Sequence, residues 1–325
     1  MKAISRRYQD AVSRIPNLTV IISTLLFLIV LIVIFSNLSP AFLTQRNLFN
    51  ILNQTSIFLI LGVGMTLVMA TGNLDISIGS MIALTTTILG ITVIGYGFPW
   101  WLGLIICILA GGICGAFNGF VVSKFNVPSI VVTLGTLTIF KFIANWYIEG
   151  TVYAFFPEPI LWITRTRFLG LNFNIFLSII IFLIASYFLT KTTTGRYLIV
   201  TGANRNIANL SGIKTNIIRF FPFLLMGLLV GVVSIILSSR LNSAQAATGV
   251  GMEMHTIAAV VLGGTTIMGG KALMSGTLLG VFILSVLENG TTLAGLGYYW
   301  QRVIIGFLFI TVVAIHSWRE KRTKQ

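Results

Sequence analysis

The chain has 325 residues, of which 56% are hydrophobic and 9% are charged. Soluble domains carry roughly 25% charged residues because their surfaces face water, so this composition excludes a soluble globular protein and indicates a surface in lipid. The net charge of +14 comes from 21 Lys and Arg residues against seven Asp and Glu residues. These basic residues gather in short stretches between apolar runs, which is typical of membrane-protein loops and not of a nucleic-acid-binding surface.

Ten apolar segments are predicted membrane spans, because a helix needs about 20 apolar residues to cross the hydrocarbon core. An open strand cannot cross lipid, since its backbone polar groups would have no hydrogen-bond partners. We therefore predict an all-α polytopic membrane protein in which residues 1–325 form one transmembrane domain of about ten helices. The predicted spans are 18–36, 54–70, 75–95, 100–123, 128–148, 173–190, 217–239, 255–268, 272–292 and 297–316.

The first predicted span follows a basic start that contains Lys2, Arg6, Arg7 and Arg14. No small-residue cleavage site follows this span, so we expect a retained helix and not a cleaved signal peptide. The second and eighth spans are short and contain glycine, which makes them candidates for broken helices.

The basic residues also predict the orientation of the chain. Four lie in the N-terminal tail, five lie between Lys191 and Arg219, and four lie in the C-terminal tail. Ten spans bring all three clusters to the same side, and the positive-inside rule assigns that side to the cytoplasm. Both termini are then cytoplasmic, and segments 37–53, 149–172 and 240–254 lie outside.

The segment TGNLDISIGS, residues 71–80, joins the second and third spans and contains Asp75. A carboxylate buried in the membrane costs several kcal/mol unless it is paired, so Asp75 is a candidate functional residue. The alternative is that Asp75 caps the next helix, whose N-terminus favours an anion. We favour the cap over direct contact with a solute.

A second glycine-containing segment, VLGGTTIMGG at residues 261–270, resembles the first. Gly263 and Gly270 are seven residues apart, as are Gly72 and Gly79. Two interrupted helices in corresponding halves of a transporter indicate a pathway built from an internal repeat. Glycines that allow helices to pack closely are the competing explanation.

Other predicted spans contain polar side chains that need hydrogen-bond partners in hydrocarbon. For each one, a contact between helices is the simplest explanation, and together they suit a pathway for a polar, uncharged solute. They are Asn118, Thr133, Thr136, Asn145, Glu288 and Asn289. We take as candidate pathway residues Asn73, Asp75, Asn118, Thr136 and Asn289.

Outside the spans, the segment NRNIANLSGIKTNIIR (204–219) carries Ala208, Leu210 and Ile213 at helical spacings. Its pattern predicts a short amphipathic helix that either contacts a partner protein or lies on lipid headgroups, and the residues leave both open.

The chain has no GxxxxGK[ST] loop for phosphate, so any ATP must be hydrolysed by another subunit. The chain has only two histidines, and Cys107 and Cys114 lie in an apolar segment, so we predict no metal site.

Several long segments resemble the permease subunits of ribose-type sugar ABC importers. They include SPAFLTQRNLFNILNQTS (39–56), GMTLVMATGNLDISIGS (64–80), NGFVVSKFNVPSIVVTLGT (118–136) and TGRYLIVTGANRNIANLSGIK (194–214). They continue with SRLNSAQAATGVGMEMHTIAAVVLGGTTIMGG (239–270) and ENGTTLAGL (288–296). The resemblance covers nearly the whole chain in order.

This resemblance implies a pair of ten-helix permease chains, identical or homologous, that form one pathway across the bacterial inner (plasma) membrane. It implies two cytoplasmic ATPase subunits that use ATP and Mg, a periplasmic or lipid-anchored solute-binding protein, and no cofactor bound by this chain. Residues 191–216 would be the cytoplasmic coupling segment, which transmits closure of the ATPase dimer to the bundle. Its expected contact residues are Gly202, Asn204, Ala208, Leu210, Gly212 and Ile213.

On the outer side, Arg46, Arg240 and Arg302 are candidates for pairing with the acidic rim of the binding protein. The expected solute is a monosaccharide, ribose first. The alternative is autoinducer-2, carried by two different permease chains. Asn73 and the segment 271–273 depart from the sugar permeases, so the solute stays open.

Two rival classes of protein remain to be compared. An ion-coupled secondary transporter would need an intramembrane carboxylate that binds a cation, for which Asp75, Glu253 and Glu288 are available. A membrane-embedded enzyme would need a nucleophile and a base or a metal site, and the sequence pattern indicates neither.

Overall fold

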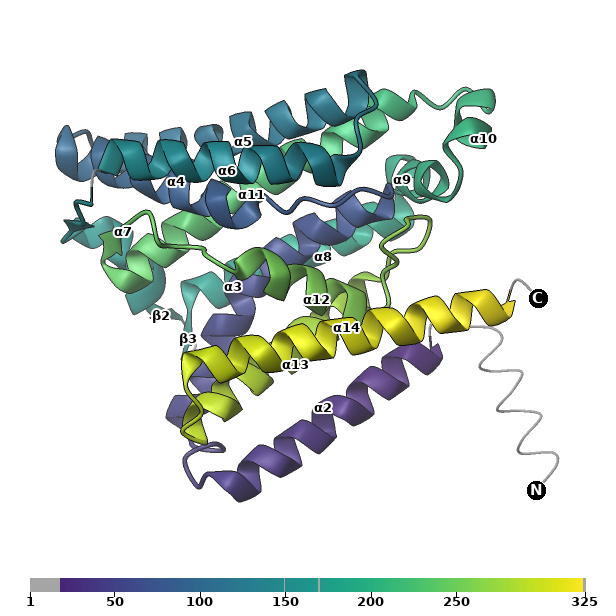
Figure 1. Ribbon diagram of the computed structural model, residues 1–325. Coiled ribbons are helices and arrows are strands. Elements are labelled where there is room, and N and C mark those ends of the chain that lie inside the picture. The colour runs from purple at the N-terminus through teal and green to yellow at the C-terminus, as the bar shows by residue number, and fades with distance from the viewer. Residues whose placement is uncertain (1–17, 149, 169, 324–325) are drawn as a thin grey trace.

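The computed structural model describes residues 18–148, 150–168 and 170–323, which form a bundle of helices (Figure 1). The helices are α2 (Leu18–Leu38), α3 (Gln45–Ala70), α4 (Ile78–Gly90) with the π-helical turn η1 (Ile91–Gly95), α5 (Trp100–Lys124), α6 (Ser129–Ile148), α7 (Glu158–Arg165), α8 (Phe173–Lys191), α9 (Thr193–Ala203), α10 (Arg205–Leu210), α11 (Thr215–Leu241), α12 (Met252–Leu262), α13 (Met274–Leu293) and α14 (Tyr298–Thr323).

Four two-residue strands lie in the loops. β1 (Tyr153–Ala154) pairs antiparallel with β4 (Ser243–Ala244), and β2 (Arg167–Phe168) pairs antiparallel with β3 (Leu171–Asn172). The first pair ties the loop after α6 to the loop after α11, although the two are far apart in sequence.

The prediction of an all-α polytopic membrane protein is confirmed. Within the described residues, eight helices are long and apolar enough to cross a membrane. Two shorter apolar helices, Met252–Leu262 and Tyr299–Thr311, occupy the other two predicted spans. The eighth predicted span is short, as expected, because α12 ends at Leu262 and a glycine-rich loop follows.

The second predicted span is neither short nor broken. α3 is a continuous helix of 26 residues, and it includes residues 45–53, which the sequence placed in an external loop. Neighbouring helices satisfy the polar side chains in this first part of α3. Asn47 exchanges two hydrogen bonds of 2.8 Å with Asn289 of α13, and Gln54 donates to Glu288 at 2.7 Å. The polar first turns of α3 can therefore pack inside the bundle, and they do not form an external loop.

The helices run between two ends of the bundle (Figure 1). α9 and α10 protrude at one end, where α2 begins and α14 finishes. At the opposite end α3 begins, α11 finishes and α14 begins. The start of α2 and the end of α14 thus lie at the same end of the bundle as the basic segment 191–219. The N-terminal basic cluster of the orientation prediction lies outside the described residues.

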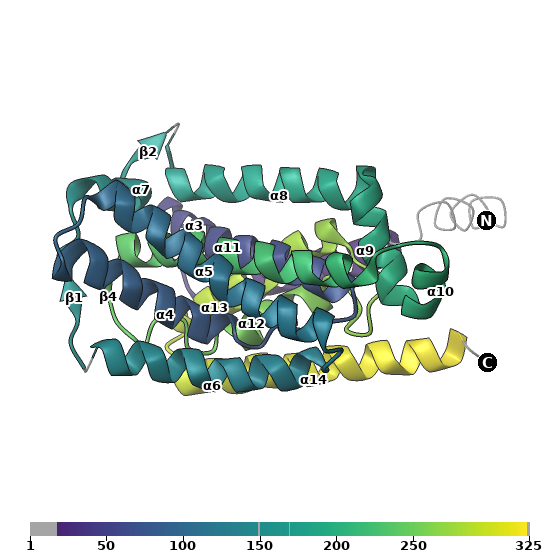
Figure 2. The same ribbon diagram turned by 90° about the horizontal axis from the view of Figure 1, so that it is seen from above.

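From above, α8 lies on one flank of the bundle and α6 and α14 lie on the other, with α3, α5 and α11 between them (Figure 2). The α5–α11 contact is made by two glycine pairs spaced four residues apart. A Cβ on Gly115 would overlap the Phe223 carbonyl oxygen, and one on Gly227 would overlap the Gly111 carbonyl oxygen. Glycine at these positions therefore allows the two backbones to approach closely, as in other membrane helix pairs.

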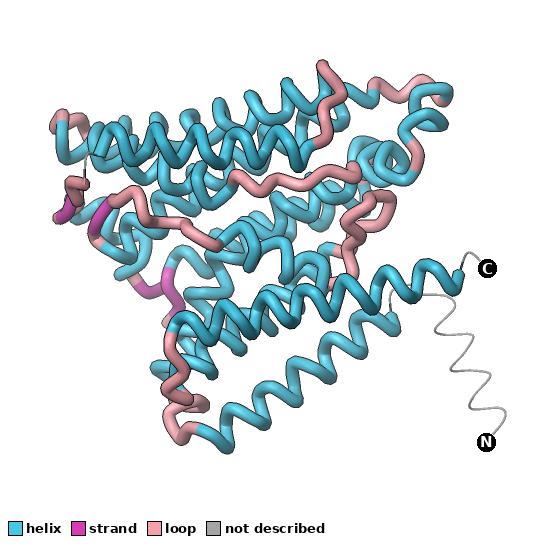
Figure 3. The backbone as a smooth tube through the Cα atoms, viewed as in Figure 1, coloured by secondary structure: helices cyan, strands magenta, loops and turns pink. Residues whose placement is uncertain are grey.

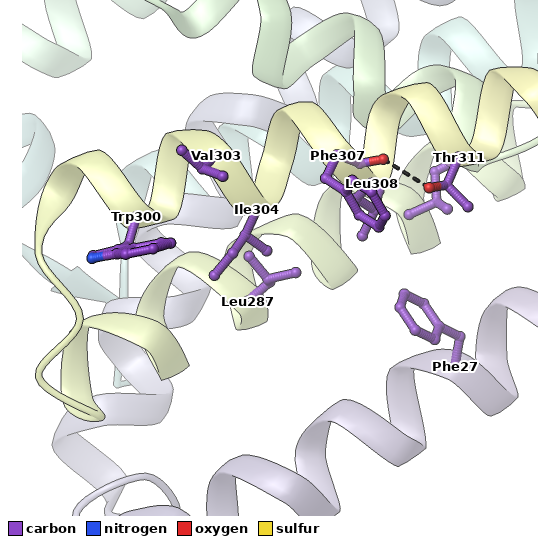
Figure 4. Close-up of a pocket in the computed structure, with 9 residues that line it drawn as sticks. Phe27, Leu287, Trp300, Val303, Ile304, Phe307, Leu308 and Thr311 are labelled. Carbon is purple, nitrogen blue, oxygen red and sulfur yellow. Dashed lines mark hydrogen bonds between the residues drawn. The ribbon is translucent and has the colours of Figure 1, made fainter.

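An apolar groove of about 650 Å³ lies between the helices α2 and α14 (Figure 4). Phe27 faces it from α2, and Trp300, Val303 and Phe307 face it from α14. Thr311, one of the few polar residues in its lining, donates its hydroxyl hydrogen to the Phe307 carbonyl at 2.9 Å. This groove has the chemistry of a lipid-facing surface and not of a site for a polar solute.

Candidate functional site

α10 is a short helix with defined caps at both ends. The Asn204 side chain accepts the Ile207 backbone N–H at 3.0 Å, which is the bond expected of an Asn N-cap. At the other end Gly212 has φ +81° and donates to the Asn209 carbonyl, and Ile213 donates to the Ala208 carbonyl. A glycine with positive φ is the usual way to end a helix, so this sequence fixes α10 as one rigid turn and a half.

The caps leave two apolar side chains on the outside of α10. Leu210 is 89% exposed and Ile207 is 57% exposed, and we call these two residues the apolar tip. Ala208, in contrast, is fully buried against the bundle. The Thr215 hydroxyl donates to Asn209 Oδ1 at 2.6 Å and ties α10 to the start of α11.

The residues expected at the coupling contact are therefore divided. Leu210 and Gly212 are exposed, Asn204 caps the helix, and Ile213 is partly buried in the following turn. Ala208 packs inward, and Gly202 faces other loops of the chain, so these two support α10 and do not form its outer surface. Ile207 was missed because its exposure depends on how α10 sits on the bundle.

The end of α9 meets two loops at a glycine cluster, which is formed by Gly72, Gly202, Gly269 and Gly270. A Cβ on Gly202 would overlap the Ala70 carbonyl oxygen and lie 2.7 Å from the Gly270 nitrogen. The Gly270 N–H donates to the Ala70 carbonyl at 3.2 Å. This glycine junction, as we name it, joins α9 to the ends of both interrupted segments, so the two glycine-rich stretches that resemble each other in sequence are in contact.

Between α3 and α4 the chain runs as an extended loop through the bundle (Figure 3). Asp75 in this loop is fully buried, and its Oδ1 accepts the Ser77 backbone N–H at 2.9 Å and the Ser77 hydroxyl at 2.6 Å. Asn118 of α5 donates to the Ser77 hydroxyl at 2.8 Å and lies 3.5 Å from Asp75 Oδ2. Asp75 thus binds Ser77, the N-cap residue of α4, from a buried position, and it does not itself cap the helix, because α4 has no side-chain cap hydrogen bond.

The comparisons with known proteins identify the family. The sequence model of the family described as "Branched-chain amino acid transport system / permease component" matches residues 47–313. The chain belongs to this permease family. The ribose import permease protein RbsC of Escherichia coli K12 is 38% identical over 298 residues, which are 90% of this chain and 92% of that protein.

Other relatives of the permease match a similar share of this chain. RbsC of Bacillus subtilis is 34% identical over 295 residues, 89% of this chain and 90% of the relative. The autoinducer 2 import system permease protein LsrC of Escherichia coli SMS-3-5 is 31% identical over 293 residues, 90% of this chain and 85% of the relative. No solved structure matches the chain.

The other candidate pathway residues of the permease do not join Asp75 and Asn118 in one group. Asn73 accepts from Arg219 at 3.2 Å. The Thr136 hydroxyl donates to the carbonyl of Thr133 within α6 at 3.4 Å. Asn289 pairs with Asn47 near the start of α3. Asn73 and Asn289 thus make contacts between segments of the chain, and Thr136 bonds within its own helix.

Next to Asn289, three residues from three helices, Gln54, His255 and Glu288, form a polar cluster that the sequence did not reveal. The Glu288 carboxylate accepts from Gln54 and lies 3.3 Å from His255 Nε2. The His255 ring stacks on Phe58 with centroids 3.7 Å apart. This cluster links α3, α12 and α13 in the half of the bundle farther from α10.

The three arginines predicted to dock a binding protein all belong to helix ends opposite α10. Arg46 lies in the first turn of α3 and Arg240 lies in the last turn of α11, and both are exposed. Arg302, near the start of α14, donates to the carbonyls of Gly251 at 3.1 Å and Val250 at 3.2 Å. Arg302 therefore holds the loop before α12.

We expect Asp75→Ala to destabilise the permease by about 1–3 kcal/mol, because it removes the acceptor of two buried hydrogen bonds from Ser77. Asp75→Asn keeps an oxygen that accepts these bonds and should lose less. Thermal unfolding in detergent, followed by tryptophan fluorescence, measures the difference. An Asp75→Ala variant as stable as the parent chain would show that the hydrogen bonds to Ser77 do not hold the start of α4 in place.

Proposed function

We propose that this chain is the membrane subunit of an ATP-driven ribose importer in the bacterial inner membrane. It would pair with a second permease chain, identical or homologous, and work with two cytoplasmic ATPase subunits and an external solute-binding protein. The observation that carries the proposal is the 38% identity to a ribose import permease, which extends along 90% of this chain and 92% of the relative.

The shape of the α10 end supports coupling to an ATPase. The apolar tip of Ile207 and Leu210 projects from a capped helix, and contact with a partner protein would bury these two side chains. The caps make α10 rigid, so a displacement of the tip would move α9 and the glycine junction together. In the proposed orientation this end, with both termini of the chain, is cytoplasmic.

Autoinducer-2 is the second candidate solute, because permeases named for that solute are 29–31% identical over 90% of this chain. In that case we expect the partner to be a different permease chain and not a second copy. The lower identity favours ribose.

Uptake by living cells tests the choice of solute. Cells with and without this chain are given labelled D-ribose, and clearance of autoinducer-2 from the medium is followed in parallel. We expect loss of the chain to abolish ribose uptake and leave autoinducer-2 clearance intact. Intact ribose uptake with lost autoinducer-2 clearance would overturn the choice of ribose.

At the opposite end of the bundle, Arg240→Glu should weaken binding of the solute-binding protein by about tenfold. Arg240 is an exposed residue in the last turn of α11, and reversal of a rim charge mainly slows association. Surface plasmon resonance at two salt concentrations measures the affinity. Lys124→Glu is the control, because Lys124 is the last residue of α5, at the end of the bundle that carries α10. An unchanged affinity of the Arg240→Glu variant for the solute-binding protein would exclude a contact at Arg240.

A further inference from the structure

Arg219 is a buried cation near the start of α11, at the α10 end of the bundle. The residue is 9% exposed. Its guanidinium makes hydrogen bonds with two neutral amides, because Nη2 donates to Asn73 Oδ1 at 3.2 Å and Nη1 donates to Asn126 Oδ1 at 3.3 Å. Among the described residues it forms no ion pair with a carboxylate. A buried charge without a counter-ion is costly, so this position attracts an anion.

A second arginine lies beside the first. Arg205, the first residue of α10, donates from Nη2 to Asn216 Oδ1 at 2.9 Å, and Asn216 lies one helical turn before Arg219 on α11. The Nε atom of Arg205 is buried and has no hydrogen-bond acceptor within the described part of the chain. The two positive charges repel each other. We call Arg205 and Arg219 the arginine pair, and it combines uncompensated charge with an unused N–H donor.

The carboxylates of the described residues do not neutralise this pair. Asp75 follows Asn73 by two residues, but its carboxylate accepts two hydrogen bonds from Ser77 and forms no ion pair with an arginine. The other described carboxylates lie on α7, α12 and α13, and none of them forms an ion pair with Arg205 or Arg219. The part of the chain that the structure describes therefore supplies no anion for the arginine pair.

The surroundings of the arginine pair have the chemistry of a membrane boundary. Asn126 is exposed in the loop that joins α5 to α6, and the Lys124 ammonium lies 5.9 Å from the centroid of the Phe120 ring. Phe120, Phe125 and Ile217 are all exposed, although they are large and apolar. Charged tips beside apolar rings and stems are typical of the zone in which lipid headgroups meet hydrocarbon.

We propose that the arginine pair binds the phosphate of an anionic phospholipid, with Asn126 at the rim of the site. Arginine presents its N–H groups in a planar fork that matches phosphate oxygens, and basic pockets between membrane helices bind anionic headgroups. The acyl chains would lie along the exposed Phe125 and Ile217. A free phosphate ion would use the arginines but not the apolar residues beside them, so the surroundings favour a lipid.

Such a lipid would connect separate segments at the α10 end. Arg205 belongs to α10, Arg219 belongs to α11, and Asn126 belongs to the loop after α5. A negative charge between the arginines would replace their repulsion by attraction to a shared partner. The headgroup would therefore hold α10 against the start of α11. This role goes beyond the proposed transport function and does not depend on which solute the permease carries.

Binding of phosphatidylglycerol to the purified full-length permease tests the proposal. The lipid is titrated into the detergent-solubilised chain, and native mass spectrometry measures its affinity. We expect Arg205→Gln to weaken binding by about fivefold, the contribution of one basic residue near anionic lipid. Arg196→Gln removes an exposed arginine of α9 at the same end and should bind like the parent. Equal affinities of the Arg205→Gln variant and the parent would overturn the proposal, as would equal binding of phosphatidylcholine or inorganic phosphate.

Asn126→Asp supplies the missing anion within the chain. Asn126 Oδ1 already accepts from Arg219, and Asp, like Asn, tolerates the positive φ of +56° at this position. We expect this variant to be more stable than the parent without added lipid and to gain less stability from phosphatidylglycerol, as measured by thermal unfolding. Asn37→Asp adds the same charge at an exposed position near the end of α2 and should keep the parent response.

A protein counter-ion gives a different pattern of results. If phosphatidylglycerol binds equally to all variants while Arg205→Gln weakens the complex with the ATPase, the anion is a carboxylate of the ATPase and the lipid proposal is wrong. If the Asn126→Asp variant responds to the lipid as the parent does, Arg219 does not take part in the site, and the proposal is also wrong.

Discussion

Leu210→Asp is expected to abolish ATP-driven uptake while the permease remains folded. Leu210 is 89% exposed at the outer end of α10, so the substitution disturbs no internal packing. In the proposed complex the side chain enters an apolar groove of the ATPase, and truncation of such a central contact costs about 2 kcal/mol or more. That loss corresponds to about 30-fold weaker binding, and a buried carboxylate makes it larger. Uptake into proteoliposomes and pull-down of the ATPase subunit measure the two effects.

Leu210→Met is the matched control, because it keeps an apolar side chain of similar size. A substitution of Gly212 would be harder to interpret, since Gly212 has φ +81° and any side chain there strains the turn that ends α10. Normal uptake by the Leu210→Asp variant would show that the apolar tip does not bind the ATPase.

The second large effect is expected for Gly202→Val in the glycine junction. Any Cβ at this position overlaps the Ala70 carbonyl oxygen and approaches the Gly270 nitrogen to 2.7 Å. Both obstacles are backbone atoms, so the clash cannot be relieved by a side-chain rotation. Overpacking of this kind costs about 1–3 kcal/mol, and it would push α9 away from the loops after α3 and α12. We expect lower thermal stability and, at temperatures where the variant is folded, ATP hydrolysis without proportionate uptake.

Gly306→Val serves as the control for this prediction, because a Cβ on Gly306 of α14 meets no atom within 4 Å. The ratio of solute transported to ATP hydrolysed separates a coupling defect from simple loss of protein. A Gly202→Val variant with the parent ratio and the parent stability would exclude the junction as a mechanical link between α9 and the bundle.

The sequence predicted the helical class and the positions of the spans because hydropathy depends on local composition. It misplaced the start of α3 because Asn47 and Gln54 obtain partners from residues more than 230 positions away. It also chose polar residues such as Thr136 by type, without knowing which side of α6 they occupy. Thr136 is buried, whereas Lys141 on the same helix is exposed. Contacts between distant segments decide which polar residues of a helix are buried, and the periodicity of the sequence does not reveal these contacts.

In the coupling segment, too, the sequence predicted the helix but not which of its side chains are buried. The residues between Asn204 and Gly212 predicted a short amphipathic helix, and the structure has α10 there, with a cap at Asn204 and a glycine of positive φ at its end. Whether a given apolar residue points toward the bundle or toward a partner depends on how α10 is anchored, for example through Thr215. Ala208, which the sequence placed at the contact, is buried, and Ile207, to which it gave no role, is exposed.

The central claim is that this permease moves its solute at the expense of ATP hydrolysed by another subunit. The most direct test is uptake of labelled D-ribose into proteoliposomes that contain the permease, its ATPase and its binding protein, with ATP present or absent on the ATPase side and with or without ionophores that collapse ion gradients. We predict uptake that requires ATP and the ATPase and is unaffected by ionophores. Uptake that continues without the ATPase and stops when the ion gradients collapse would contradict the account and identify an ion-coupled transporter.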